Sequence, residues 1–282
     1  MGDLDIDTRL LATGPGSFAV ELSADWEVWG PNGGYLAAIA MRAAGVTMAR
    51  ARPVSISAHF VGAGTSRATD VVVTISRATK VATSAMVTLS QDGRVLLTAA
   101  VWGADNDLAG LEHQTDGGVA GMPAADGLPT VEERMAGVDN GPRYTFWDNF
   151  DHRPLHWIVD WENRSPSAAV TESWYRFVPT STFADPWVDA ARSLILIDVD
   201  GWPAAVLPHP RLTDYYAPTI ELTARFVGPT GANPWLLSRA AAPAAAGGII
   251  ACTGEIWTPD GRLVAVGGSS LLCRDAARRP AP

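Results

Sequence analysis

The sequence predicts an α+β protein made of two tandem domains, each an antiparallel sheet wrapped around one long central helix. The first observation is a repeat: "ISAHFVG" and "LSQDGRVLLTAAVWG" return about 167 residues later as "LTARFVG" and "WTPDGRLVAVGG". The second is that each half places one apolar helical segment before four strand-like segments. The repeat has the length of a whole domain, so the two copies are expected to pack as a pseudo-symmetric pair.

The first half contains a helix that is apolar on nearly every face. "FAVELSADWEVWG" predicts a strand and a turn, and "PNGGYLAAIAMRAAGVTMA" predicts a helix that starts near Asn32. Arg42 is its only charged residue, and a helix that is apolar all round must be enclosed by other elements. Strands are predicted at 54–60, 70–76, 81–90 and 94–102. The last two are joined by the hairpin signal Asp92-Gly93, and this sheet is expected to enclose the helix.

The second half repeats this order. "AVTESWYRFV" predicts a strand, and "DPWVDAARSLILIDVDGW" predicts a helix with Asp185 as its cap and Pro186 at its first position. Pro203 is expected to end that helix. The strands that follow are predicted at 219–226, 235–242, 249–257 and 263–273.

Between the halves, periodicity is lost. Residues 104–140 are rich in Gly, Pro, Asp and Ala and predict a linker between an N-terminal domain at 1–103 and a C-terminal domain at 141–282. Both ends of the chain, residues 1–7 and 275–282, are expected to be disordered.

Composition narrows the classes of function. A net charge of −9 argues against a nucleic-acid partner. Two cysteines are too few for a disulfide framework, and the acidic start "MGDLDID" lacks the features of a signal peptide, so a cytoplasmic protein is expected. The longest apolar stretch, 33–41, is far shorter than the ~20 residues of a membrane span. The five histidines are scattered and neither cysteine has a partner at metal-ligand spacing, so no metal or other cofactor is expected.

Asp198 is a carboxylate in a segment that is otherwise apolar. Asp198 follows four apolar residues in "SLILIDVDGW", on a helix that should be enclosed. Low dielectric would raise its pKa toward the range of a general base. The alternative is that this helix turn reaches solvent. Asp200 competes with Asp198, but two residues apart on a helix they point to different faces.

The glycine-rich start of the first helix is a second candidate. Free backbone N–H groups at a helix start can polarise a carbonyl oxygen, and glycines let a ligand approach the backbone. The alternative is a simple turn into the helix. His59 and Arg225 occupy matching positions of the two repeats and are expected to lie on a solvated sheet face.

Together these features resemble the acyl-CoA thioesterase II family of double hotdog proteins. The residues that carry the resemblance are "WGPNGGYLAAIAMRAA", "QDGR" and "GEIWTPDGRLVA", and it covers nearly the whole chain outside the linker and tails. The resemblance implies tandem hotdog domains and hydrolysis of fatty acyl-CoA. In the family, water is ordered by an Asp on the second helix, a Thr or Ser that opens the next strand, and a Gln near the end of the last strand.

The implied catalytic residues are Asp198, Thr219 and Ser269. Pro208-His209 lies at the family's distance from Asp198, and Thr219 opens the next strand. Ser269 stands where the Gln is expected, and its hydroxyl is shorter than an amide and cannot donate and accept at separate atoms. In the first repeat the matching positions are Pro53 and Val101, so only the second copy is equipped for this chemistry.

The substrate is expected to contact the first helix. Asn32, Gly33, Gly34 and Tyr35 are the predicted substrate-binding residues, with the Gly33 and Gly34 amides polarising the carbonyl. Trp26, Trp29 and Tyr35 are candidates for lining an acyl tunnel, although ordinary core packing explains any one of them.

The sequence therefore predicts an acyl-CoA thioesterase of fatty acid metabolism that uses Asp-activated water. A non-catalytic acyl-CoA or lipid-binding protein is the alternative, favoured by the missing Gln, and a hotdog enoyl-CoA hydratase is a further one. The expected partner is the acyl-CoA substrate. Two-domain chains of this kind are also expected to associate further, which leaves a homo-oligomer open.

Overall fold

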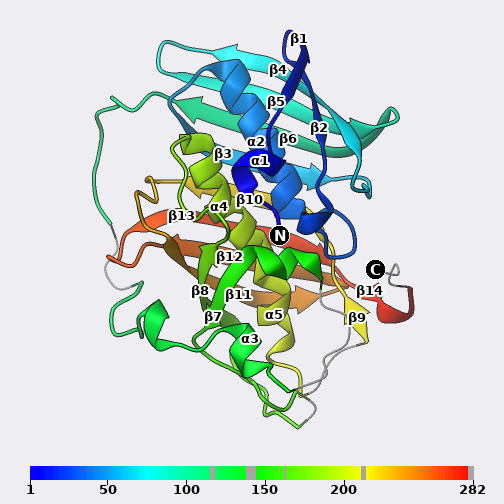
Figure 1. Cartoon of the computed structure of the whole chain (residues 1–282), viewed down its shortest axis with the longest axis vertical. Coiled ribbons are helices and arrows are strands. Elements are labelled where there is room, and N and C mark those ends of the chain that lie inside the picture. The colour runs from blue at the N-terminus through cyan, green and yellow to red at the C-terminus, as the bar shows by residue number, and fades with distance from the viewer. Residues whose placement is uncertain (115–117, 138–143, 162, 211–213, 279–282) are drawn as a thin grey trace.

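The computed structural model describes residues 1–114, 118–137, 144–161, 163–210 and 214–278. Its main feature is one twelve-stranded antiparallel sheet in the order β1-β2-β4-β5-β6-β3-β10-β13-β12-β11-β8-β7 (Figure 1). The strands of this sheet are β1 Leu11–Gly14, β2 Ser17–Glu21, β3 Arg52–Phe60, β4 Ala68–Ala78, β5 Ala82–Gln91, β6 Arg94–Ala104, β7 Phe150–Pro154, β8 Val170–Phe177, β10 Thr219–Phe226, β11 Trp235–Ala246, β12 Ile249–Trp257 and β13 Leu263–Leu272. Two short strands, β9 Tyr215–Tyr216 and β14 Arg274–Asp275, pair separately. The helices are α1 Leu4–Asp7, α2 Gly33–Met48, α3 Val131–Arg134, α4 Pro186–Val199 and α5 Gly201–Val206.

The two halves join at the centre of the sheet, where β3 pairs with β10. Ser57 lies directly opposite Thr223, its counterpart in the repeat. On either side Glu221 pairs with His59, and Ser55 pairs with Arg225. This register is symmetric about the Ser57–Thr223 pair, as a pseudo-two-fold arrangement of duplicated domains requires. The predicted α+β fold with two tandem sheet-and-helix units is confirmed.

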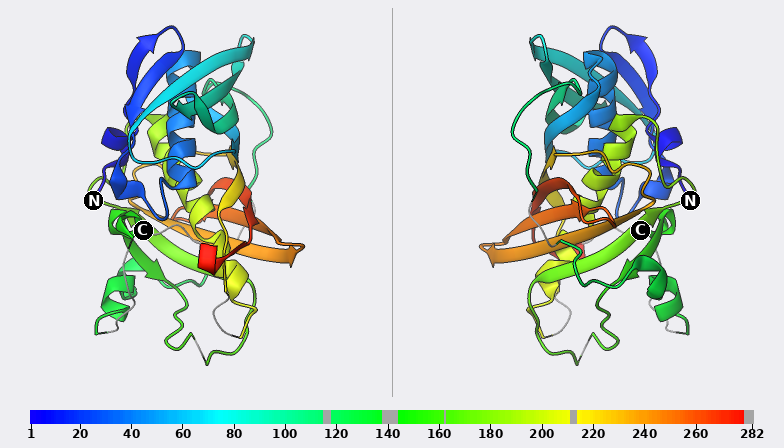
Figure 2. Two further views of the ribbon diagram at one scale, coloured as in Figure 1. Left: turned by 90° about the vertical axis from the view of Figure 1, so that its right-hand side faces the viewer. Right: turned by 90° about the vertical axis from the view of Figure 1, so that its left-hand side faces the viewer.

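The two long helices lie side by side within the curved sheet (Figures 1 and 2). Nearly all of α2 is buried, including Leu36, Ile39 and Met41, and α4 buries Leu194, Ile195 and Leu196. Side chains on the inner face of the sheet complete a core that spans both halves, such as Ile56 and Leu222. α2 thus has almost no solvated face, which is why its sequence is apolar apart from Arg42, whereas α4 buries the paired charges of Asp189 and Arg192.

The helix predicted at 185–202 is divided. α4 ends at Val199, and α5 begins at Gly201 and contains Pro203, so the expectation that Pro203 ends the helix is wrong. Proline lacks an N–H and its ring clashes with the carbonyl four residues earlier, here that of Val199. The helix therefore breaks before Pro203, and the proline is accommodated in the first turn of α5.

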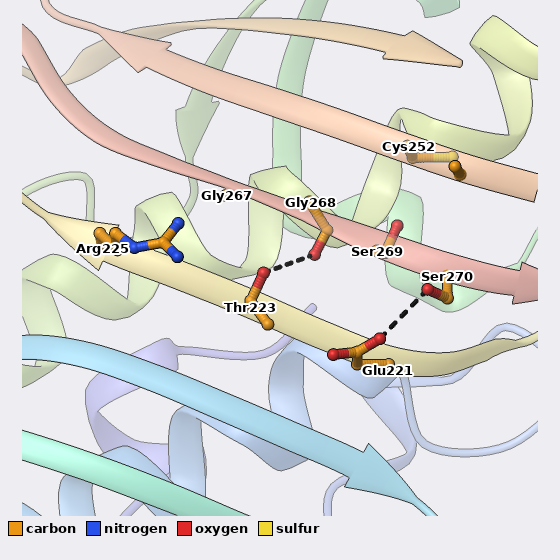
Figure 3. A pocket seen from close by; sticks show the side chains of 9 residues that line it. Glu221, Thr223, Arg225, Cys252, Gly267, Gly268, Ser269 and Ser270 are labelled. Carbon is orange, nitrogen blue, oxygen red and sulfur yellow. Dashed lines mark hydrogen bonds between the residues drawn. The ribbon is translucent and has the colours of Figure 1, made fainter. Parts of the chain in front are cut away.

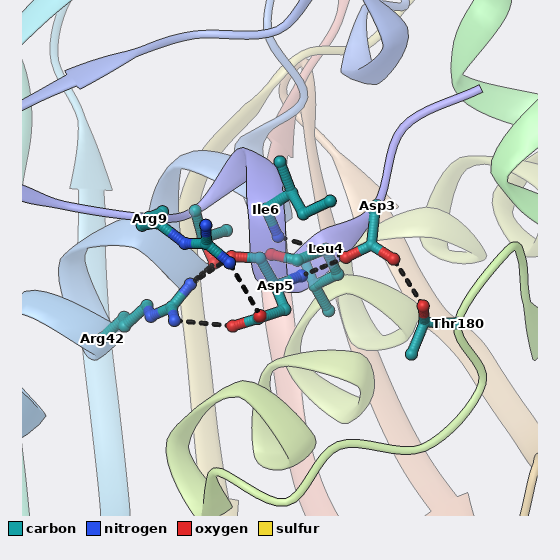
Figure 4. Close-up of polar contacts among 8 residues, drawn as sticks. Asp3, Leu4, Asp5, Ile6, Arg9, Arg42 and Thr180 are labelled. Carbon is teal, nitrogen blue, oxygen red and sulfur yellow. Dashed lines mark hydrogen bonds and ion pairs between the residues drawn. The ribbon is translucent and has the colours of Figure 1, made fainter.

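The N-terminal residues are ordered, which corrects the prediction of a disordered tail at 1–7. Asp3 caps α1, and Leu4 is only 2% exposed. Asp5 forms an ion pair with Arg42 of α2, with 2.6 Å between Oδ1 and Nη2, and Asp3 accepts a hydrogen bond from Thr180 (Figure 4). The segment is held because an apolar side chain and two carboxylates find partners on both halves.

The other predicted irregular segments also carry structure. Within 104–140 the described residues include α3 and a 3₁₀ turn at Ala125–Gly127. Arg153 donates hydrogen bonds to the carbonyls of Ala125 and Leu128, the residue that follows this turn. Residues 275–278 form the end of β14 and a further 3₁₀ turn, whereas 279–282 lie outside the described residues. Among the helices of the described residues, none is long and apolar enough to cross a membrane.

The outer face of the sheet is the face away from α2 and α4, and at β8, β11 and β12 it is covered by linker residues around Ala125. A cavity of about 220 Å³ lies there along β10 and β13, with Glu221 and Arg225 at its two ends (Figure 3). His59 and Arg225 are both exposed on this face, as expected. Glu221 accepts a hydrogen bond from Ser270, and Thr223 donates one to the Gly268 carbonyl. These groups lie on the opposite side of the sheet from α2 and α4.

Candidate active site

Asp198 lies where α4 ends, 8% exposed, with both carboxylate oxygens hydrogen-bonded. Thr219 Oγ1 donates to Oδ1 at 2.7 Å. The Gly34 backbone N–H donates to Oδ2 at 2.9 Å, and Asn32 Nδ2 donates to the same oxygen at 3.2 Å. The donors come from the first helix and from the strand that follows the second helix, so the site forms only when both halves are packed together.

The local sequence around Asn32 and Thr219 explains how each reaches Asp198. Asn32 is the cap of α2, because its Oδ1 accepts the Tyr35 N–H at 3.0 Å. This bond leaves the Asn32 Nδ2 free to point at Asp198. Thr219 is the first residue of β10 and follows Pro218, which leads the chain into the strand.

The two glycines at the start of α2 let the two helices touch. A Cβ at Gly34 would lie 2.8 Å from the Cα of Ile195, closer than real Cβ atoms approach. A Cβ at Gly33 would lie 3.1 Å from both Asp198 Oδ2 and the ring of Phe60. The glycines therefore permit a backbone amide to reach a carboxylate on the neighbouring helix.

Burial raises the pKa of Asp198 above its ordinary value, and the hydrogen bonds from Thr219, Gly34 and Asn32 act in the opposite direction. The donors stabilise the charged form and hold its geometry, while the enclosure makes the carboxylate a stronger base than an exposed aspartate. Asn32, Gly33 and Thr219 are half-buried, so the site lies near the surface.

Asp200 faces a different part of the molecule, as its spacing from Asp198 required. Its Oδ1 accepts a hydrogen bond of 2.7 Å from the buried hydroxyl of Tyr175. Burial raises the pKa of Asp200 to about 6, with the hydroxyls of Tyr175 and Ser238 opposing the shift. Asp198 is the carboxylate that lies among the predicted site residues.

Ser269 lies on the inner face of β13, opposite Leu222 of β10 and Cys252 of β12. It is 5% exposed, and its hydroxyl has no hydrogen-bond partner among the residues that the structure describes. No hydrogen bond joins it to Asp198. Thr219 pairs with Leu271, two residues along the same face of β13, so Ser269 lies near the Asp198–Thr219 pair without touching it through a polar contact.

The predicted substrate-binding residues divide into two groups. Asn32, Gly33 and Gly34 adjoin Asp198, but the Gly34 N–H is already bonded to that carboxylate and is not available to polarise a substrate carbonyl, which corrects that expectation. Gly33 differs, because its N–H has no acceptor among the described residues. Sequence reasoning placed Asn32 against the substrate and missed its bond to Asp198.

The aromatic candidates mostly belong to the core. Tyr35 and Trp26 are fully buried and stacked, with ring centroids 5.3 Å apart, and the Tyr35 hydroxyl donates to the Asp7 carbonyl. They pack in the core rather than along an opening. Trp29 lies outside this cluster, edge-on to Tyr216 at 5.0 Å between centroids. The position of Cys252 opposite Ser269 could not be predicted from the sequence, because a single cysteine carries no signal of its neighbours in space.

Comparisons with known proteins agree with this architecture. The model of the acyl-CoA thioesterase N-terminal domain matches residues 22–104, and that of the acyl-CoA thioesterase C-terminal domain matches residues 123–268. No curated protein matches the sequence.

Solved structures show the same fold. An acyl-CoA thioesterase II from Mycobacterium marinum superposes with a TM-score of 0.78 at 19% identity, over 97% of this chain and 98% of that one. A conserved protein of unknown function with a hot dog fold from Alicyclobacillus acidocaldarius gives 0.78 at 20% identity, over 99% and 98%. A dehydratase domain from Mycobacterium tuberculosis is less similar, with a TM-score of 0.50 at 15% identity over 93% and 97%.

The two family models together cover most of the chain, with the N-terminal model on the first half and the C-terminal model on the second. Their match agrees with the duplicated sheet-and-helix units and with the central pairing of β3 and β10. The chain belongs to the acyl-CoA thioesterase II-like family of double hotdog proteins.

Proposed function

We propose that the protein hydrolyses acyl-CoA thioesters, with Asp198 as the general base. The observation that carries the proposal is the buried Asp198 carboxylate, fixed by Thr219, Gly34 and Asn32 across the contact between the two halves. A base held in this way needs no reorganisation when it takes a proton, and its raised pKa brings it closer to neutral pH.

In the proposed reaction, Asp198 accepts a proton from a water molecule whose oxygen bonds to the thioester carbonyl carbon. The carbon–sulfur bond then breaks, and the proton passes from Asp198 to the departing thiolate, which gives the free acid and CoA. The Gly33 N–H is the proposed donor to the carbonyl oxygen, since it adjoins Asp198 and has no acceptor among the described residues. Such a donor stabilises the oxyanion that forms as the water adds.

Ser269 is proposed to contact the same water. Its hydroxyl is buried and unpartnered on the sheet beneath α4, near Thr219. Asn32 is proposed to hold the Asp198 carboxylate in place and not to bind the substrate. We also propose an acyl-CoA partner, a place in fatty acid metabolism and a cytoplasmic location.

The test is release of free thiol from a panel of acyl-CoA chain lengths. Asp198→Asn removes the base with little change in size and is expected to abolish turnover while leaving the protein folded. Asp200→Asn is the matched control, because it makes the same change two residues away in a side chain that is equally enclosed but bonded to Tyr175. It is expected to keep turnover at neutral pH.

Other outcomes would replace the proposal. Tight acyl-CoA binding without thiol release would establish the non-catalytic alternative, which the absence of the expected glutamine favours. Hydration of an enoyl-CoA would establish the hydratase alternative, although none of the three hydrogen-bond donors to Asp198 is a histidine. Undiminished turnover by Asp198→Asn would eliminate Asp198 as the base.

A further inference from the structure

An aromatic ring lies against the place where Gly33 and Asp198 meet. Phe60 is the last residue of β3, and its side chain is half-buried. A Cβ built at Gly33 would lie 3.1 Å from Phe60 Cζ, 3.3 Å from Phe60 Cε1 and 3.1 Å from Asp198 Oδ2. Ordinary contacts between carbon atoms are about 3.5–4.0 Å long. The ring edge and the carboxylate therefore leave no room for a methyl group at this point.

Strand register brings Phe60 to this position. β3 pairs with β10, and Glu221 lies opposite His59, so the end of β3 adjoins the beginning of β10 (Figure 1). Successive side chains of a strand point to opposite faces, and because His59 faces outward, Phe60 faces inward. Thr219, which donates to Asp198, is the first residue of β10. The ring is therefore on the same face of the sheet as the proposed reaction.

The surrounding structure holds the ring in place. Phe60 pairs with Leu97 of β6, and the N–H groups of Val61 and Gly62 both donate to the Leu96 carbonyl, at 2.9 and 3.1 Å. The ring also packs against the main hydrophobic core. Protein interiors are close-packed, so a ring with this support cannot turn away from a ligand without leaving a void. Phe60 thus forms a fixed wall.

The two sides of a bound thioester have different requirements. The CoA part carries phosphate charges and must stay in water, because burying unpaired charges is costly. The acyl part is apolar and is stabilised by contact with apolar surface. Phe60 connects the surface near Asp198 with the main core, so the acyl side of the carbonyl faces the ring. The carbon next to the carbonyl is then the part of the acyl chain closest to the wall.

The repeat supplies an internal comparison. Phe226 is the counterpart of Phe60, but it is 7% exposed and belongs to the core. The residue after the cap of α4 is Pro186, which has no N–H, whereas the residue after the cap of α2 is Gly33. The start of α4 thus lacks the carbonyl donor that is proposed for the start of α2. Phe226 is therefore a matched residue for a control.

We propose that Phe60 is a specificity-determining residue: its ring edge excludes acyl groups that are branched at the carbon next to the carbonyl. The substrate class is then acyl-CoA that is unbranched at this carbon, an inference that rests on the proposed hydrolysis. A methyl branch there points toward the ring edge and Asp198, where a methyl group does not fit. A branch one carbon further along the chain lies beyond this contact.

The kinetic test uses three substrates: the straight-chain acyl-CoA that wild type hydrolyses fastest, and its 2-methyl and 3-methyl derivatives. In wild type, kcat/KM is expected to be about 10- to 200-fold lower for the 2-methyl derivative than for the straight chain, the range for one methyl-sized group in a tight pocket. Phe60→Ala is expected to reduce that ratio to about 3-fold or less, and Phe60→Leu to an intermediate value. The ratio for the 3-methyl derivative should stay as in wild type.

Phe226→Leu is the control for Phe60→Leu, because it makes the same change at the counterpart in the repeat, and it should keep the wild-type ratios. Phe60→Leu also decides the question if Phe60→Ala does not fold. Wild-type ratios in both Phe60 variants would overturn the proposal. Equal losses with all three substrates would mean a purely structural role and would also overturn it, as would a wild type that hydrolyses the 2-methyl derivative as fast as the straight chain.

A binding test separates this inference from the proposed hydrolysis. Analogues in which a methylene group separates the sulfur from the carbonyl keep the carbonyl but cannot be hydrolysed, and calorimetry gives their Kd. If wild type releases no thiol from any acyl-CoA, the proposed hydrolysis fails and the analogues decide the role of Phe60. Weaker binding of the 2-methyl analogue than of the straight-chain analogue by wild type, but not by Phe60→Ala, would support the wall. The same preference in both proteins would refute it.

Discussion

Gly34→Ala is the substitution that most directly tests the contact between the two helices. In an ordinary helix interior this change stabilises by up to about 1 kcal/mol, because alanine loses less backbone entropy than glycine. At Gly34 the new Cβ would lie 2.8 Å from the Cα of Ile195, and a backbone atom cannot move aside as a flexible side chain can.

The cost can be worked from the distances. Ordinary contact begins near 3.4 Å, so the start of α2 must withdraw from α4 by about 0.6 Å. The same movement stretches the 2.9 Å hydrogen bond from the Gly34 N–H to Asp198 to about 3.5 Å, the limit for such a bond. Overpacking costs about 1–3 kcal/mol and a weakened bond to a charged group about 1.5 kcal/mol or more. After the helix-propensity gain of up to about 1 kcal/mol, we expect a net loss of about 1.5–3.5 kcal/mol.

Two measurements check this. Urea denaturation gives the free energy of unfolding, and thiol release from acyl-CoA gives kcat, which should fall roughly 10-fold or more because Asp198 loses a donor. Gly127→Ala is the matched control: its Cβ would meet nothing within 4 Å, so its stability should stay within about 0.5 kcal/mol of wild type. A Gly34→Ala protein as stable and active as wild type would refute the close helix contact as the reason for glycine here.

Three further predictions concern single side chains. Thr219→Val keeps the shape of the residue but removes the donor that lowers the pKa of Asp198. The acid limb of the pH profile of kcat should therefore move to higher pH, and kcat should fall roughly 10- to 100-fold. An acid limb at the same pH as in wild type would contradict this prediction. The pKa of Asp200 is about 6 in the folded protein and 3.8 in the unfolded chain, so between pH 3.8 and about 6 only the folded protein holds the proton. The free energy of unfolding should therefore fall by about 1.4 kcal/mol per pH unit as the pH rises through this range. Asp200→Asn should remove that slope in urea denaturation, and parallel curves for the two proteins would count against it. Leu4→Ala should cost about 2–5 kcal/mol in the same assay, whereas Ile6→Ala, at a side chain that is 59% exposed, should be nearly neutral; equal effects would mean that α1 does not anchor the chain.

Much of the fold could be predicted from local patterns. The repeat predicted two domains, and the apolar helices predicted enclosure by sheets, because a helix with no polar face cannot remain in water. The errors occurred where tertiary contacts overrode composition. The N-terminal "MGDLDID" has the polar composition of a tail, yet Leu4 is buried and Asp5 finds Arg42 thirty-seven residues away. Pro203 signalled the end of a helix but not that a second short helix would contain it.

By itself, the sequence determined which residue types were available for chemistry: a carboxylate among apolar residues, glycines at a helix start, and a serine where the family resemblance expects glutamine. Only the tertiary structure decided what they contact. Asn32 and Gly34 lie 166 and 164 residues before Asp198 and became its hydrogen-bond donors only through the packing of α2 on α4. The same packing occupied the Gly34 amide and left that of Gly33 without an acceptor among the described residues. Strand register placed Cys252 opposite Ser269. Whether a hydrogen bond forms depends on differences of a few tenths of an ångström in the distance between groups that are remote in the chain, and no local pattern encodes those distances.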